Sequence, residues 1–197
     1  MDPLARIREH FAASARLKQE SVGTLAPAIA RAAQVLTDSL LANRKILACG
    51  NGGSAADAQH FAAEMVGRFE RERPELPAIS LSTDTSILTA VGNDYAFDQI
   101  FAKQVRALGS DGDVLLAIST SGNSGNVIAA VDAAREREMR VIALTGKGGG
   151  RIGGMLIDDD VHVCVPHEST ARIQEVHLLV IHCLCDAVDN ALLGDEA

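Results

Sequence analysis

Five short apolar segments alternate with helical segments over most of the chain, and this alternation constrains the fold more than any other feature of the sequence. Almost every residue in these segments is apolar, which is typical of parallel strands that helices cover on both faces. The pattern predicts a doubly wound α/β fold around a five-stranded parallel sheet of the flavodoxin-like kind. The predicted strands are Lys45–Cys49, Ala78–Ser82, Asp113–Thr120, Arg140–Thr145 and Val161–Pro166.

Apolar residues three and four positions apart predict helices between and around the strands. Residues 6–41 contain two such stretches separated near Gly23 and Pro27, so we expect an N-terminal helical hairpin before the first strand. A chain of 197 residues corresponds to a single domain, with the hairpin over residues 1–43 and an α/β sandwich over residues 44–197. The later predicted helices are Ser54–Arg68, Phe97–Leu108, Ser124–Glu138 and Ser169–Leu193.

Composition and charge argue against several classes of partner. The chain has 18 basic and 26 acidic residues, a net charge of −8, and no basic run that would follow a nucleic-acid backbone. The first residues lack the basic-then-apolar pattern of a signal peptide, and the apolar stretch Val176–Cys185 is shorter than the ~20 residues of a membrane span. We therefore expect a cytoplasmic protein with no membrane or nucleic-acid partner. Its four cysteines are expected to be reduced core residues.

The most informative loop runs from Ser119 to Ser124 and contains three serines and a threonine directly before a predicted helix. In open parallel sheets, ligands bind on such loops at the carboxyl ends of the strands. The hydroxyl groups and the free N–H groups of the helix N-terminus together favour a single phosphate as the ligand. Alternatively, Ser121 and Ser124 are only turn and N-cap residues, although capping needs a single hydroxyl.

Two predicted helices carry polar side chains that suit a metal ion or acid–base chemistry. His60 and Glu64 share one helix face, while Gln174 and His182 lean toward one flank of the closing helix. Two imidazoles, a carboxylate and an amide can coordinate Zn²⁺. Spacing alone leaves a surface His–Glu pair and a hydrogen-bonded core histidine open as alternatives. His177, one turn from Gln174, competes as a ligand.

Several sequence blocks together resemble the SIS (sugar isomerase) domain and, within it, the bacterial phosphoheptose isomerases. The strand that leads into Ser119–Ser124 is similar to the phosphosugar-binding signature of that domain, and the resemblance covers essentially the whole chain. The other matching blocks are Cys49–Ser54, Asp57–Phe61, Gly92–Asp94, Gly112–Leu116, Ala143–Gly146 and Arg172–Glu175.

The resemblance implies an isomerase that converts sedoheptulose 7-phosphate into D-glycero-D-manno-heptose 7-phosphate, the first committed step toward the heptose of lipopolysaccharide. It also implies a cytoplasmic homotetramer with sites built between subunits, one Zn²⁺ per subunit, and a role for the N-terminal hairpin in packing the oligomer. The residues that match the zinc site are His60, Glu64, Gln174 and His182. The residues that match the phosphate cradle are Ser119, Thr120, Ser121 and Ser124.

The resemblance also identifies residues that line the sugar, namely Asn51, Gly52, Gly53, Asn93 and Asp94, with Glu64 and Gln174 contributing to substrate binding as well. From the residues alone, the Asn93–Asp94 pair is equally consistent with a simple turn. Isomerisation of a ketose to an aldose moves a proton between adjacent carbons through an enediol. Glu64 is the candidate base and His182 the candidate acid, or the two exchange roles, because a carboxylate and an imidazole both have the titratable chemistry this requires.

Two other interpretations remain open at this level. The chain also resembles a tetrameric initiator-associating protein of the same fold, which binds the replication initiator and is not an enzyme. In that group the positions of Glu64 and His182 carry residues unsuited to acid–base chemistry, so the carboxylate and imidazole found here favour the enzyme. A phosphosugar-sensing module without catalysis would need only the Ser119–Ser124 loop.

Overall fold

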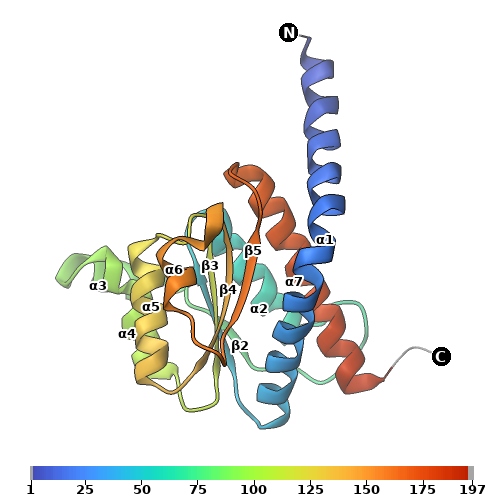
Figure 1. The fold of residues 1–197 in the computed structure, drawn as a ribbon. Helices are drawn as coiled ribbons and strands as arrows, with labels where there is room; N and C mark the ends of the chain where they lie inside the picture. The colour runs from blue at the N-terminus through green and yellow to red at the C-terminus, as the bar shows by residue number, and fades with distance from the viewer. Residues whose placement is uncertain (1, 195–197) are drawn as a thin grey trace.

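A computed structural model describes residues 2–194 and contains the expected five-stranded parallel sheet (Figure 1). The strands lie in the order β2-β1-β3-β4-β5, so the chain reverses its direction of winding after β2. This sheet confirms the doubly wound α/β fold that the alternating pattern predicts. The strands are β1 (Ile46–Gly50), β2 (Ala78–Ser80), β3 (Val114–Ser119), β4 (Arg140–Gly146) and β5 (Val161–Val165).

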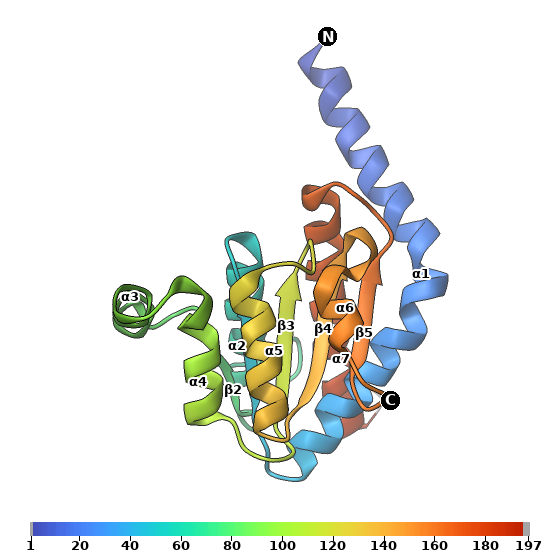
Figure 2. The same ribbon diagram turned by 60° about the vertical axis from the view of Figure 1, so that its left-hand side comes forward.

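Helices cover both faces of the sheet and bury two separate apolar clusters (Figures 1 and 2). Along β3, Leu116 and Ile118 face one cluster, while Leu115 and Ala117 face the other. This alternation follows from the period of two along a strand, and it explains why the strands are apolar throughout. The first face carries α1 (Pro3–Leu41), α2 (Gly53–Val66) and α7 (Thr170–Leu193). The second face carries α4 (Ile100–Leu108), α5 (Gly125–Glu136) and α6 (Gly150–Met155).

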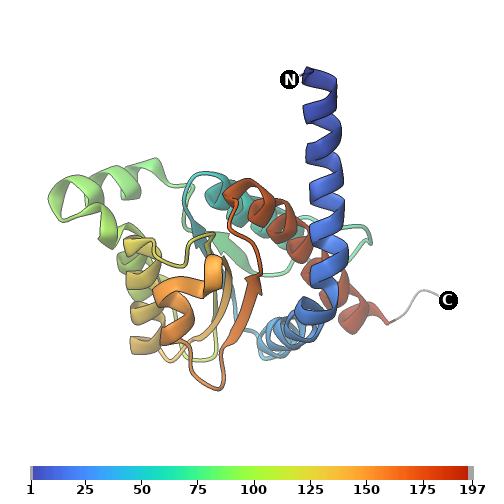
Figure 3. The same cartoon turned by 45° about the horizontal axis from the view of Figure 1, so that its top comes forward.

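The prediction of an N-terminal hairpin is wrong, because residues 3–41 form the single helix α1, which passes through Gly23 and Pro27 without a turn. Its N-terminal half extends beyond the body of the molecule (Figure 3). Leu25 and Ala32 are buried on either side of Pro27 and lie on one helix face, since they are seven residues apart. Packing of this continuous apolar face therefore outweighs the local preference of proline for a break.

Among residues 2–194, only helix α7 has the length and the apolar composition that a membrane-spanning helix needs. In the fold it packs against α1, α2 and the sheet, and Ile173, Ile181 and Leu184 have no exposed surface. It is therefore a core helix of this domain. The closing helix expected over Ser169–Leu193 is confirmed.

Several other helices also differ from the prediction. The segment expected as one helix from Phe97 contains a short 3₁₀ turn, η1 (Phe97–Gln99), followed by α4. Helix α3 (Thr85–Asp94) has no buried residue and lies at the side of the domain (Figure 1). Helix α6 was not expected, because its Gly-rich sequence has low helix propensity and only tertiary contacts stabilise it.

Because helices cover both faces of the sheet, a cavity at its centre is expected to lower the free energy of unfolding strongly. Replacing the fully buried Leu116 by alanine is expected to lower the free energy of unfolding by about 2–5 kcal/mol, since the neighbours relax only partly around the lost methyl groups. Leu41→Ala is the control, because Leu41 is 67% exposed and its loss should change stability by less than about 0.5 kcal/mol. Chemical denaturation measures both, and equal costs would contradict the assignment of the core.

Candidate active site

The loop from Ser119 to Ser124 joins β3 to α5 and presents its hydroxyl groups at the carboxyl edge of the sheet. Ser119 Oγ and Ser124 Oγ lie 3.0 Å apart and share a hydrogen bond, while Ser121 Oγ accepts a bond from the backbone N–H of Asn123 at 3.1 Å. Ser124 is the N-cap of α5, but its side chain makes no capping bond. These hydroxyls and the N-terminus of α5 thus form a compact group of donors, as the sequence predicts for an anion site.

A second glycine-rich segment holds this loop in place. The N–H of Ile152 donates to Gly122 O at 2.9 Å, and the N–H of Arg151 donates to Asn123 Oδ1 at 3.0 Å. Gly122 has φ +65° and packs so tightly on Gly149 that any side chain there would overlap its carbonyl. The start of α6 therefore supports the candidate phosphate loop, a role that the sequence did not reveal.

Asn51 forms a reciprocal amide pair with Asn126 in the first turn of α5. Asn51 Nδ2 donates to Asn126 Oδ1 and Asn126 Nδ2 donates to Asn51 Oδ1, both at 2.8 Å. The pair ties the loop after β1, with Gly52 and Gly53, to the loop after β3. The sequence analysis did not identify Asn126 as a site residue. The one available signal was that the loops after β1 and β3 share a Gly-Asn pair, Gly50-Asn51 and Gly125-Asn126.

Helices α2 and α7 bring three of the predicted residues together. His60 Nε2 and His182 Nε2 lie 2.9 Å apart, and the two rings meet edge to face. Glu64 Oε1 lies 3.5 Å from His60 Nδ1, on the far side of the ring from His182. The Phe69 ring, 5.5 Å from the His182 ring between centroids, covers this cluster from the loop after α2. A carboxylate and an imidazole are thus placed within one small, half-buried group.

Gln174 lies elsewhere along the same pair of helices. Its amide packs against Gly53 at the start of α2, where an added Cβ would come within 2.5 Å of Gln174 Nε2. Eight residues separate Gln174 from His182, so about 12 Å of helix rise lies between them. A single chain therefore does not bring all four predicted ligands to one point. The sequence showed which helix face each residue occupies, but it did not show this separation along the helix.

The fit of this cluster to a zinc ion is partial. Two facing imidazole nitrogens are the donors Zn²⁺ prefers, and the contact of Glu64 with His60 Nδ1 is the arrangement by which a carboxylate orients a ligating histidine. However, within residues 2–194 no three His, Cys, Asp or Glu side chains are arranged to hold a metal ion. One chain thus provides the two histidines and an orienting carboxylate.

Asp57 lies one turn before His60 on α2 and was not singled out as a site residue. Burial raises the pKa of its carboxyl to about 6, with a smaller opposing effect from His60. Its Oδ2 atom is buried and has no hydrogen-bond partner among the described residues. Asp57 therefore adds a second carboxyl group to the helix face that carries His60 and Glu64.

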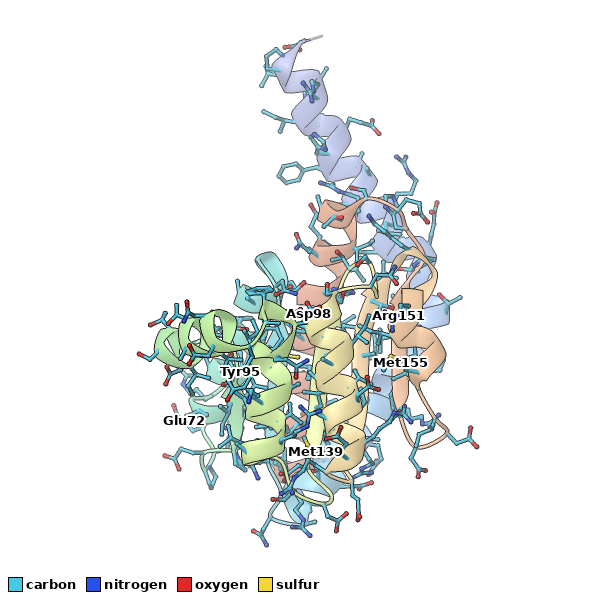
Figure 4. The ribbon with its side chains drawn as sticks, turned by 90° about the vertical axis from the view of Figure 1, so that its left-hand side faces the viewer. Glu72, Tyr95, Asp98, Met139, Arg151 and Met155 are labelled. Atoms are coloured by element: carbon cyan, nitrogen blue, oxygen red, sulfur yellow. The ribbon has the colours of Figure 1, made fainter. Side chains whose placement is uncertain are left out.

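Asn93 and Asp94 are the last residues of α3, not a turn after it, and both are exposed. Asn93 Nδ2 donates to Asp94 Oδ1 at 2.8 Å, so the pair is bonded to itself. The neighbouring η1 carries Asp98, whose carboxylate lies at the first residue of α5, 2.7 Å from where a Cβ on Gly125 would lie. Figure 4 shows Asp98 at the end of α5 and Arg151 at the corresponding end of α6. This places a carboxylate, which the sequence did not reveal, beside the candidate phosphate loop.

The two parts of the site lie at different levels of the domain. Gly53 marks the carboxyl edge of the sheet, and His60 is seven residues further along α2, about 10 Å away by helix rise. The candidate phosphate loop is at the edge, whereas the His60–Glu64–His182 cluster lies within the layer of helices. Within one chain the candidate phosphate loop and the titratable cluster are therefore separate.

His177, the competing ligand, has a structural role instead. It is fully buried in α7, and its Nε2 bonds to the carbonyl of Thr145 at 2.9 Å. Thr145 in turn pairs in register with Ser119 and shares a hydrogen bond with His162 at 2.7 Å. His177 therefore anchors the end of β4 beside the candidate phosphate loop, and it is a hydrogen-bonded core histidine.

Comparison with known proteins gives the class to which this fold and site belong. A family model described as the SIS domain matches residues 9–146, which include β1, β3 and the Ser119–Ser124 loop. The fold and the anion loop thus define a SIS domain.

More similar proteins identify a particular family within this class. Phosphoheptose isomerases from Methylibium petroleiphilum and Aromatoleum aromaticum are 66% and 67% identical, over 97% and 100% of this chain and 96% and 99% of their own lengths. Solved structures of phosphoheptose isomerases from Neisseria gonorrhoeae and Francisella tularensis superimpose with TM-scores of 0.92 and 0.94, at 59% and 49% identity. Each superposition covers 96% of this chain and 100% of the solved chain. The chain belongs to the phosphoheptose isomerase family, and the initiator-associating alternative finds no support.

The burial of His177 predicts a pH dependence of stability. Desolvation lowers the pKa of its imidazole from 6.5 to about 4. Between these values the unfolded chain binds a proton that the folded chain does not, so folding stability falls as the pH falls from 6.5 to 4. The shift corresponds to about 3 kcal/mol.

The measurement is the free energy of unfolding against pH for the native chain and for His177→Gln, whose amide keeps a donor for Thr145 O. The native chain should lose stability relative to the variant over this range, since contributions from Asp57 and His162 are common to both. Parallel curves would contradict a neutral buried His177.

Proposed function

We propose that this chain isomerises sedoheptulose 7-phosphate to D-glycero-D-manno-heptose 7-phosphate and so supplies heptose for lipopolysaccharide synthesis. The observation that carries the proposal is the meeting of Glu64 and His182, through His60, in a chain that also has a hydroxyl-rich anion loop. Membership of the phosphoheptose isomerase family over the full length of the chain supports the same reaction.

In this proposal the substrate phosphate binds the Ser119–Ser124 loop, where hydroxyl groups and the N-terminus of α5 neutralise its charge without arginine or lysine. Asn51, Gly52 and Gly53 line the sugar beside it, since the Asn51–Asn126 pair fixes that loop next to the phosphate loop. Gln174, packed on Gly53, extends the same surface with an amide that suits sugar hydroxyls.

The reaction moves one proton between adjacent carbons. Glu64 removes the proton from C1 of the open-chain ketose, while His182 donates a proton to the carbonyl oxygen on C2, which gives the 1,2-enediol. Return of a proton to C2 and loss of the proton from the C1 hydroxyl then give the aldose. The two residues exchange roles in the reverse direction, and Phe69 shields the imidazole from water.

We also propose one Zn²⁺ per subunit at the His60–His182 pair. The two Nε2 atoms would hold the ion. The family resemblance suggests Glu64 and Gln174 as further ligands, although one chain does not bring all four residues to one point. When bound, the ion would polarise the substrate carbonyl as a Lewis acid.

A cytoplasmic homotetramer with sites between subunits is part of the proposal. The tetramer is supported by the distance within one chain between the candidate phosphate loop and the His60–Glu64–His182 cluster. A second subunit would bring these two parts of the site together. The free N-terminal half of α1 offers an apolar packing surface, because Leu4, Ile7 and Phe11 are more than half exposed.

The direct test is formation of aldose from sedoheptulose 7-phosphate by the purified full chain, before and after chelation and with Zn²⁺ added back. We expect turnover that falls on chelation and returns with zinc. Turnover that is indifferent to chelation would refute the role of zinc and leave the reaction standing. A folded chain that binds the phosphosugar without converting it would refute the isomerase.

Substitutions should separate chemistry from binding. Glu64→Gln removes the proposed base at nearly constant shape, so kcat is expected to fall by about 10²–10⁴-fold. The double variant Ser121→Ala, Ser124→Ala removes phosphate donors, so KM should rise by about tenfold or more while kcat changes less. Near-native turnover in Glu64→Gln, or unchanged phosphosugar affinity in the double variant, would contradict these roles.

A further inference from the structure

A buried ion pair lies just below the titratable cluster and belongs to none of the predicted sites. Arg73, in the loop after α2, contacts Asp189 of α7 through Nε and Oδ1 at 2.6 Å. Their side chains are only 1% and 2% exposed. A pair so completely removed from water is costly to form unless its geometry serves some purpose.

The remaining N–H groups of Arg73 bind the end of α2. Nη2 donates to Glu64 O at 2.7 Å, and Nη1 donates to Met65 O at 2.8 Å. The last carbonyls of a helix lack partners within it, and α2 has no basic residue of its own in its last turn. The guanidinium of Arg73 therefore caps α2 at the very residue that carries the proposed catalytic carboxylate.

Asp189 extends this contact to the catalytic part of α7. It follows His182 by seven residues, which is two helical turns, so both residues lie on the same face. Arg73 thus joins the backbone of Glu64 to the face of α7 that carries His182. A slip of one residue along the helices would move Glu64 by about 1.5 Å relative to His182, whereas catalytic groups must be held within about 0.5 Å.

The geometry of the pair carries a cost to stability. Asp189 Oδ2 is buried and has no hydrogen-bond partner within residues 2–194, which is a cost that a purely structural pair need not carry. All of the well-formed bonds of Arg73 to helix α2 fall at Glu64 and Met65.

We propose that Arg73 and Asp189 are positioning residues that set the end of α2, and with it Glu64, against His182. This inference rests on the proposed function, because Glu64 and His182 are its catalytic groups. Neither Arg73 nor Asp189 touches the reacting atoms; they act through the backbone of α2.

Three variants of the full chain test the proposal. Arg73→Lys keeps the charge and loses the fork that reaches three acceptors, and Asp189→Asn keeps the shape and loses the charge. The double variant Arg73→Met, Asp189→Leu removes both charges, so it avoids an unpaired buried ion and should fold as well as the native chain. The matched control is Arg135→Lys, since Arg135 also pairs with a buried aspartate, Asp160, but contacts neither α2 nor α7.

All three variants are expected to lower kcat by about tenfold or more with KM within about threefold, because geometry is lost and phosphate binding is kept. Arg135→Lys should lower the melting temperature without changing kcat. In a Glu64→Gln background, Arg73→Lys should have little further effect, since there is no carboxylate left to position. The imidazole NMR signals of His60 and His182 should shift in Arg73→Lys and not in Arg135→Lys.

Native kcat in the double variant, or an equal effect of Arg73→Lys with and without the Glu64 carboxylate, would overturn the proposal. A double variant that fails to fold would assign the pair to stability and overturn it too. An inactive native chain would instead refute the proposed function, and the imidazole signals would then decide the positioning role by themselves.

Discussion

The proposed chemistry of this domain depends on the contact between α2 and α7, which run side by side in the same direction across one face of the sheet. Three contacts follow one another along them: Gly53 with Gln174, His60 with His182, and the end of α2 with Asp189 through Arg73. The first is possible because glycine allows close approach. The last satisfies two helix carbonyls and one oxygen of a buried carboxylate. Displacement of either helix would separate the groups of the proposed site.

The sheet determines where the second half of the site lies. Because all five strands are parallel, their carboxyl ends meet at one edge, and the loops after β1, β3 and β4 gather there. The Asn51–Asn126 pair and the bonds from Arg151 and Ile152 then hold these loops together. These bonds fix the Ser119–Ser124 loop, which would limit the entropy lost when the proposed phosphate binds. In that proposal, oriented dipoles let an acidic chain bind an anion.

Much of the fold could be predicted from the sequence, because the signals for it are local. Apolar runs of strand length, separated by helical periodicity, correctly predicted five parallel strands and the helices α2, α4, α5 and α7 around them. The Ser119–Ser124 loop was identified as a candidate site because hydroxyl groups before a helix are a local signal for anion binding. The N-terminal hairpin was predicted wrongly, since Gly23 and Pro27 are local break signals, whereas α1 is held straight by packing on both sides of Pro27.

The sequence by itself determined the class of fold, the edge of the sheet that carries the candidate ligand loop and the residue types available for proton transfer. Only the tertiary structure decided which of those residues meet. It placed His60 beside His182 and Gln174 beside Gly53, and it paired Arg73 with Asp189 across more than a hundred residues of chain. The physical reason is that helical periodicity specifies which face a side chain occupies but not the axial level at which two helices pack. That level is set by side-chain shape and buried charge at the contact.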